Sequence, residues 1–264
     1  MKHTIFLLHG MGNHTGDWAK EQGYLDAIKQ VYGQYEILAK KPIEDRFEFV
    51  PVSYDHIFAD IVKIWADNAK MISALAAETG APVGKLVNWL KGAGELNSNF
   101  AWSHAADVLL YRGFRLVREA VCTNVANQII TVVNKQHTEF GKSSWSVVAH
   151  SLGTAVIHDT LARIGAPNKD WPGNLAFSST NEQAKVVMMV ANVSKVLEVK
   201  TVDEPYDAYG QKDASGNFLT TVAPGFSGQL GRECLYYVNI RHKLDPFTIP
   251  KMFNPLDWPD HAAA

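Results

Sequence analysis

Short apolar stretches and longer amphipathic stretches alternate along this chain. The first short stretch is continuously apolar, as expected for a parallel strand that is covered on both faces of a sheet. Alternation of strands with helices indicates an α/β fold with a mostly parallel central sheet flanked by helices. The predicted strands are Thr4–Leu8, Arg46–Tyr54, Trp145–Ala149, Lys185–Ala191 and Cys234–Arg241, and the first predicted helix covers residues 16–32.

The segment between the second and third predicted strands is far longer than one crossover helix requires. Apolar positions at helical spacing predict a helix over residues 57–77 and a long amphipathic helix over residues 105–136. The second of these is the expected crossover, so residues 56–100 form a helical insertion that is rich in tryptophan. Two interpretations stay open, ordinary packing and a cap over an apolar ligand cleft. Because no linker-like stretch interrupts the pattern, residues 1–264 are predicted to be a single domain.

The third predicted strand leads directly into a helix through the sequence V-V-A-H-S-L-G-T, which starts at Val147. Ser151 lies at the junction, with the small residues Ala149 and Gly153 two positions to either side. This is the pattern of a nucleophile elbow, G-x-S-x-G, with alanine at the first position. His150 is expected to pack beside the turn. The alternative is an ordinary serine at a helix N-cap.

A glycine-rich turn that begins at His9 follows the first predicted strand and reads H-G-M-G. In hydrolases with a nucleophile elbow, one N–H group of the oxyanion hole comes from a loop at this place. We expect the N–H groups of Met11 and Leu152 to be the two donors, with Gly10 allowing close approach and His9 bracing the loop. A dinucleotide-binding fingerprint starting at Gly10 fails because it requires glycine where the chain has Thr15.

Together these two motifs resemble the α/β-hydrolase superfamily, on its lipase and esterase side. A third segment, residues 237–247, ends in H-K-L-D-P-F. It resembles the acid-bearing loop after the penultimate strand, which often reads H-x-x-D-P, as in DDHD-type phospholipases. The resemblance implies an α/β-hydrolase fold with the insertion between the second and third predicted strands. It also implies a catalytic triad in the order serine, acid, histidine.

Asp245 is the predicted acid of this triad, since it lies just past a strand end where the loops converge. Asp203 is the reserve. His261 is the predicted base because it is the only histidine after Asp245, and it follows a Trp-Pro pair that would restrict the chain. Two alternatives remain open: His242 paired with Asp203, and a base that this sequence does not contain.

These residues predict a serine hydrolase that cleaves carboxylic esters through an acyl-enzyme on Ser151. The apolar insertion favours a small-molecule ester with a short to medium acyl chain or an aromatic group. A lipase or thioesterase variant of the same chemistry stays open, as does a non-catalytic binding or scaffold protein with a hydrolase fold. Neither a cofactor nor a metal is expected, because His158 and Asp159 have no third ligand at metal-binding spacing.

Composition narrows the classes of partner. The 264 residues include 25 Lys+Arg and 27 Asp+Glu, so the net charge of -2 gives no reason to expect nucleic acid. The two cysteines, Cys122 and Cys234, are too few for a disulfide framework. Because the chain shows no apolar run of about 20 residues and no leader, we expect a cytoplasmic protein with no integral membrane association, or one exported by a signal that this sequence lacks. The oligomeric state is left open.

Overall fold

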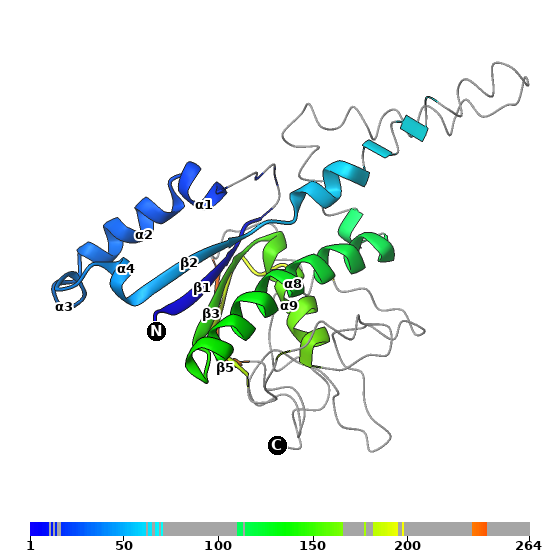
Figure 1. Cartoon of the computed structure of the whole chain (residues 1–264). Helices are drawn as coiled ribbons and strands as arrows, with labels where there is room; N and C mark the ends of the chain where they lie inside the picture. Colours follow the sequence, from blue (N-terminus) through cyan, green and yellow to red (C-terminus); the bar gives the residue numbers. More distant parts are fainter. Residues whose placement is uncertain are drawn as a thin grey trace, which may run out of the picture. The chain divides into compact units, whose positions relative to one another are not determined.

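The structure, a computed structural model, has five strands in the order in which the sequence predicts them (Figure 1). It describes residues 1–10, 12, 14, 17–61, 63, 64, 67, 68, 70, 110–112, 114–165, 177, 182–194, 197 and 234–241. The strands are β1 (His3–Leu8), β2 (Phe47–Val52), β3 (Trp145–His150), β4 (Ala184–Val190) and β5 (Cys234–Ile240). Each lies within two residues of its predicted start and end.

All five strands form one open, fully parallel sheet with the order β2-β1-β3-β4-β5. The predicted parallel α/β architecture is therefore confirmed. The chain reverses its direction of winding between β1 and β3, where Leu8 pairs with Ala149. In sheets of this type, ligands bind outside the carboxyl ends of the strands at such a switch point. The predicted nucleophile and the predicted oxyanion loop follow these two strands.

The helices differ from the sequence prediction in their boundaries. The helix expected over residues 16–32 is divided in two at Gly23, whose φ of 73° is left-handed and which precedes α2 as its N-cap. The crossover helix α8 extends four residues beyond its predicted end and stops before Gly141, which has a φ of 67° and donates an N–H bond to His137. The helices are α1 (Trp18–Glu21), α2 (Tyr24–Gly33), α3 (Glu36–Ala39), α4 (Ile43–Arg46), α8 (Arg115–Phe140) and α9 (Leu152–Gly165).

Helices cover both faces of the sheet. On one face, Trp18 and Ala19 of α1 pack on Leu7 of β1. On the other, Gln136 of α8 donates a 2.6 Å hydrogen bond to the hydroxyl of Thr4, and α9 packs on β3 and β1. The inner strands β1 and β3 consequently contain no exposed residue. The fully buried apolar residues of the sheet include Phe6, Val147, Ala149, Val187 and Met189.

The chain forms two compact units. The described residues of 1–10, 16–53 and 122–264 make up the first, which holds the whole sheet. The second comprises the described residues of 11–15 and 54–121, among which residues 55–61 are helical. Most of the proposed insertion, residues 56–100, lies outside the described residues, so both the cap and the single domain stay predictions. Among the described helices, none is long and apolar enough to cross a membrane.

Candidate active site

Ser151 occupies a sharp turn between the last residue of β3 and the first residue of α9. Its φ is 50°, in the left-handed region that non-glycine residues rarely adopt. Holding an L-residue there costs about 1–2 kcal/mol. The Ser151 N–H is held by a 3.0 Å hydrogen bond to the carbonyl of Val190 on the neighbouring strand β4. Ser151 is half-buried.

Two glycines allow the backbone after β1 to lie against this turn. A Cβ atom on Gly10 would lie 3.0 Å from Ser151 Cβ and 3.1 Å from His150 Nδ1. A Cβ atom on Gly153 would lie only 2.4 Å from the carbonyl oxygen of His9. Real Cβ contacts essentially never come that close, so glycine at position 153 is a steric requirement. The two sequence motifs therefore place one glycine, Gly10, against the Ser151 turn and the other, Gly153, where α9 packs on the end of β1.

The other predicted residues around Ser151 lie at the same end of the sheet. Leu152 is the first residue of α9 and is buried, and N–H groups in this first turn have no acceptor within the helix. His9 is buried, with Nδ1 2.8 Å from the Gly10 carbonyl oxygen and its ring edge-on to Trp18. The structure therefore brings Ser151, Leu152, Gly10, His9 and His150 to the junction of β1 and β3.

The remaining predicted site residues lie outside the described part of the chain. They are Met11 in the oxyanion loop, the predicted acid Asp245 with its reserve Asp203, and the predicted base His261 with its alternative His242. Their assignments stay predictions. The strand that precedes Asp245, β5, is described. It pairs with β4, which in turn lies beside β3, the strand that ends just before Ser151.

A turn after β4 contributes residues that the sequence patterns do not single out. Ala191 also has a φ of 50°, and its N–H bonds to the Ile240 carbonyl of β5 at 2.9 Å. The next residue, Asn192, is buried and donates a 3.0 Å hydrogen bond to the hydroxyl of Tyr237. Burial raises the pKa of the Tyr237 hydroxyl, so it is neutral at pH 7. The only sequence signal for this turn is its place at the carboxyl end of a predicted strand.

His158 lies further along α9 and is completely buried. Burial lowers the pKa of its imidazole from 6.5 to about 3, because an apolar environment disfavours the charged form. The ring is therefore neutral at physiological pH. This arrangement fits a structural role inside α9 and links stability to pH.

We expect the free energy of unfolding to fall as the pH drops below 6.5. Above that value the His158 site is neutral in both states, so its contribution is fully present. Below it the unfolded chain binds a proton that the folded chain excludes, which costs up to about 1.4 kcal/mol per pH unit until about pH 3. The plot of the free energy of unfolding against pH, measured by urea unfolding between pH 7.5 and 4.5, should be less steep for His158→Gln than for the wild type. The difference in slope corresponds to at most one bound proton. An unchanged slope in His158→Gln would contradict this role of His158.

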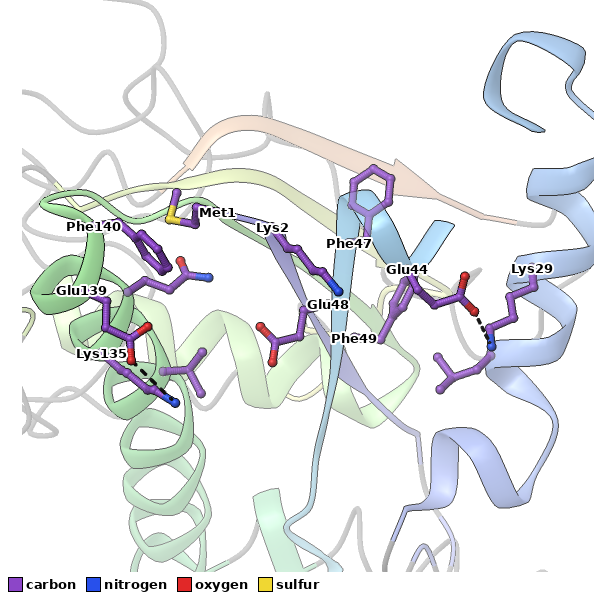
Figure 2. Close-up of a pocket in the computed structure, with 13 residues that line it drawn as sticks. Met1, Lys2, Lys29, Glu44, Phe47, Glu48, Phe49, Lys135, Glu139 and Phe140 are labelled. Atoms are coloured by element: carbon purple, nitrogen blue, oxygen red, sulfur yellow. Dashed lines mark ion pairs between the residues drawn. The ribbon is translucent and has the colours of Figure 1, made fainter. Parts of the chain in front are cut away.

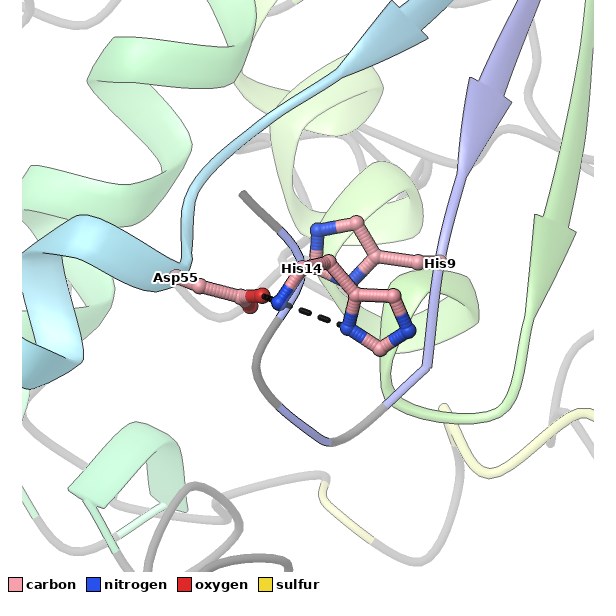
Figure 3. Close-up of side chains that lie close together, drawn as sticks. All are labelled: His9, His14 and Asp55. Carbon is pink, nitrogen blue, oxygen red and sulfur yellow. Dashed lines mark hydrogen bonds and ion pairs between the residues drawn. The ribbon is translucent and has the colours of Figure 1, made fainter. Parts of the chain in front are cut away.

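The second compact unit contains a histidine–carboxylate pair (Figure 3). His14 Nδ1 lies 3.2 Å from Asp55 Oδ2, and the His14 backbone N–H donates to the same oxygen. Asp55 directly follows the end of the second predicted strand, but a lone aspartate there carries no motif. The pair ties His14 to the start of the helix at residues 55–61.

A cavity of about 620 Å³ lies beside the edge strand β2 (Figure 2). Two ion pairs lie in its lining, Lys29–Glu44 at 2.7 Å and Lys135–Glu139 at 3.8 Å. None of the described residues that line it belongs to the predicted catalytic set. The cavity is therefore separate from the site at Ser151.

No protein-family model, no curated protein and no solved structure matches this chain significantly. The geometry of the Ser151 turn and the chemistry of its residues are therefore the basis for assigning a function.

Proposed function

We propose that the protein is a serine hydrolase that cleaves carboxylic esters, with Ser151 as the nucleophile. The observation that carries the proposal is the left-handed backbone of Ser151 at the β3–α9 junction. Backbone strain of this kind persists where the surrounding structure over-determines it, and it concentrates at active sites. In a nucleophile elbow the strained turn presents the serine hydroxyl at the top of the sheet.

The close approach of Gly10 supports the same proposal. A substrate carbonyl that reaches Ser151 Oγ would lie near the start of α9 and near Gly10, whose backbone packs against the Ser151 turn. The positive end of the α9 dipole favours negative charge at this point. The proposed oxyanion hole consists of the N–H groups of Leu152 and Met11, each contributing about 3 kcal/mol to transition-state stabilisation.

In the proposed reaction, Ser151 Oγ attacks the ester carbonyl while His261 takes the hydroxyl proton. His261 then gives this proton to the departing alcohol, and Asp245 stabilises the imidazolium in between. Water, activated by the same histidine, attacks the acyl-enzyme and releases the carboxylic acid. We also propose that the fold is that of an α/β-hydrolase. The parallel order β2-β1-β3-β4-β5 supports this, because it sets the loop after β1 beside the strand of the nucleophile.

Hydrolysis of p-nitrophenyl esters by the full-length protein tests the proposal. We expect turnover of acetate through octanoate esters, with short to medium chains preferred. The second candidate function, a non-catalytic binding protein, predicts no turnover with any acyl length. A preference for long chains would instead favour the lipase variant, and turnover of acyl-thioesters above oxygen esters would favour a thioesterase.

The base assignment gives a separate prediction. His261→Ala should lower kcat by at least about a hundredfold, because general base catalysis contributes about 10²–10⁴-fold. His242→Ala should leave kcat within about twofold if His261 is the base. The assay is ester hydrolysis across pH 5 to 9. A large loss of kcat in His242→Ala with none in His261→Ala would instead assign the role of base to His242, with Asp203 as its acid.

A further inference from the structure

We propose that Thr154 is a positioning residue that holds Ser151 in its strained conformation by linking it to the turn after β4. The inference rests on the proposed function, since it explains how the nucleophile is kept in place. It concerns a side chain that the nucleophile-elbow pattern leaves unassigned. Thr154 contacts the backbone around the nucleophile and not the reacting atoms.

The Thr154 hydroxyl is both a hydrogen-bond donor and a hydrogen-bond acceptor. Its Oγ1 donates a 2.6 Å hydrogen bond to the Ser151 carbonyl oxygen, and it accepts a 3.0 Å hydrogen bond from the N–H of Val193. The Thr154 backbone N–H also donates to the Ser151 carbonyl, at 2.9 Å. Thr154 is completely buried, so water does not compete for these bonds.

This hydroxyl completes a closed set of bonds around the nucleophile. The Ser151 N–H is held by the Val190 carbonyl at the end of β4. The Ser151 carbonyl accepts a hydrogen bond from the Thr154 hydroxyl, which is itself held by the N–H of Val193. Val193 lies three residues after Val190, in the turn that follows β4. Both peptide groups that flank the Ser151 side chain are thus fixed to one segment. The left-handed φ of Ser151 is stable because neither peptide plane can rotate alone.

Removal of the hydroxyl should release one of these two anchors. Thr154→Val keeps the shape of the side chain but loses both bonds and leaves the buried Val193 N–H without its acceptor. We expect kcat for ester hydrolysis to fall about tenfold with KM changed less than twofold, because the nucleophile is misplaced while substrate contacts remain. Thr154→Ser retains the hydroxyl and should stay within about twofold of the wild type.

Two measurements test this inference: the rate constant of labelling by a fluorophosphonate probe, and hydrogen exchange at the Val193 amide. Thr154→Val should be labelled about tenfold more slowly and exchange Val193 faster, while Thr154→Ser should match the wild type in both. If Thr154→Val does not fold, Thr154→Ala removes the same hydroxyl without placing a methyl group against the Val193 N–H.

The outcomes separate this inference from the proposed function. Faster exchange at Val193 with unchanged labelling and kcat would show that Thr154 stabilises α9 only, and would overturn the inference. A wild-type protein that is not labelled at all would refute the proposed function, and the inference with it. Equal loss of labelling in Thr154→Val and Thr154→Ser would also contradict it, since the hydroxyl would then not be the relevant group.

Discussion

Replacing Ser151 with alanine should abolish ester hydrolysis while leaving the protein folded. Loss of a serine nucleophile removes the covalent path, and a loss of at least about a thousandfold in kcat is expected. The fold should persist because the bonds that hold this turn use the Ser151 backbone, not its side chain. Alanine also tolerates the left-handed φ about as well as serine. Initial rates with p-nitrophenyl butyrate, together with the urea midpoint, measure both effects.

Ser143 provides a matched control for this substitution. It is the same residue type at the opposite, amino-terminal end of β3, where its hydroxyl bonds to Glu182. Ser143→Ala should keep full activity, although losing the bond to Glu182 will lower stability slightly. Activity retained in Ser151→Ala, or lost equally in both variants, would contradict the assignment of the nucleophile.

Replacing Gly153 with alanine should strongly destabilise the protein. The new Cβ would lie 2.4 Å from the His9 carbonyl oxygen and 3.1 Å from both Cβ and the carbonyl oxygen of Leu8. These are mostly backbone atoms at the end of a central strand, so no side chain can rotate away to relieve the clash. Overpacking in such a site costs about 3 kcal/mol. For a chain of this size, that corresponds to a fall in Tm of roughly 6–12 °C.

Gly33 is the control for the effect of adding a methyl group to glycine. It is the last residue of α2, and a Cβ there would meet no atom within 4 Å. Gly33→Ala should raise stability by about 0.5–1 kcal/mol, because alanine loses less conformational entropy on folding. Thermal unfolding followed by circular dichroism compares the two variants. A Gly153→Ala protein as stable as the wild type would show that β1 and α9 do not pack this closely.

The sheet was predictable from the sequence because its strands are short apolar runs bounded by turns. Continuous apolar character in Thr4–Leu8 already indicated a strand covered on both faces, and the structure places it second in the sheet. Helix boundaries were less accurate. The break at Gly23 depends on a left-handed φ that the sequence permits but does not require.

The centre of the candidate site was also predictable, because a strand–turn–helix serine flanked by small residues is a local pattern. The contribution of the turn after β4 was not. The bond between Thr154 and Val193 joins residues 39 positions apart, and it exists because β3 and β4 are neighbours in the sheet. Long-range contacts of this kind follow from strand order, which local periodicity does not encode.

Fluorophosphonate labelling of the wild-type chain, with the modified peptide identified by mass spectrometry, determines whether Ser151 is an activated nucleophile. The reagent forms a stable adduct only with a serine that is activated as a nucleophile, and fluoride leaves. We expect one adduct per chain, located on Ser151, and none in Ser151→Ala. An unlabelled wild-type protein, or an adduct on another residue, would show that Ser151 is not the nucleophile.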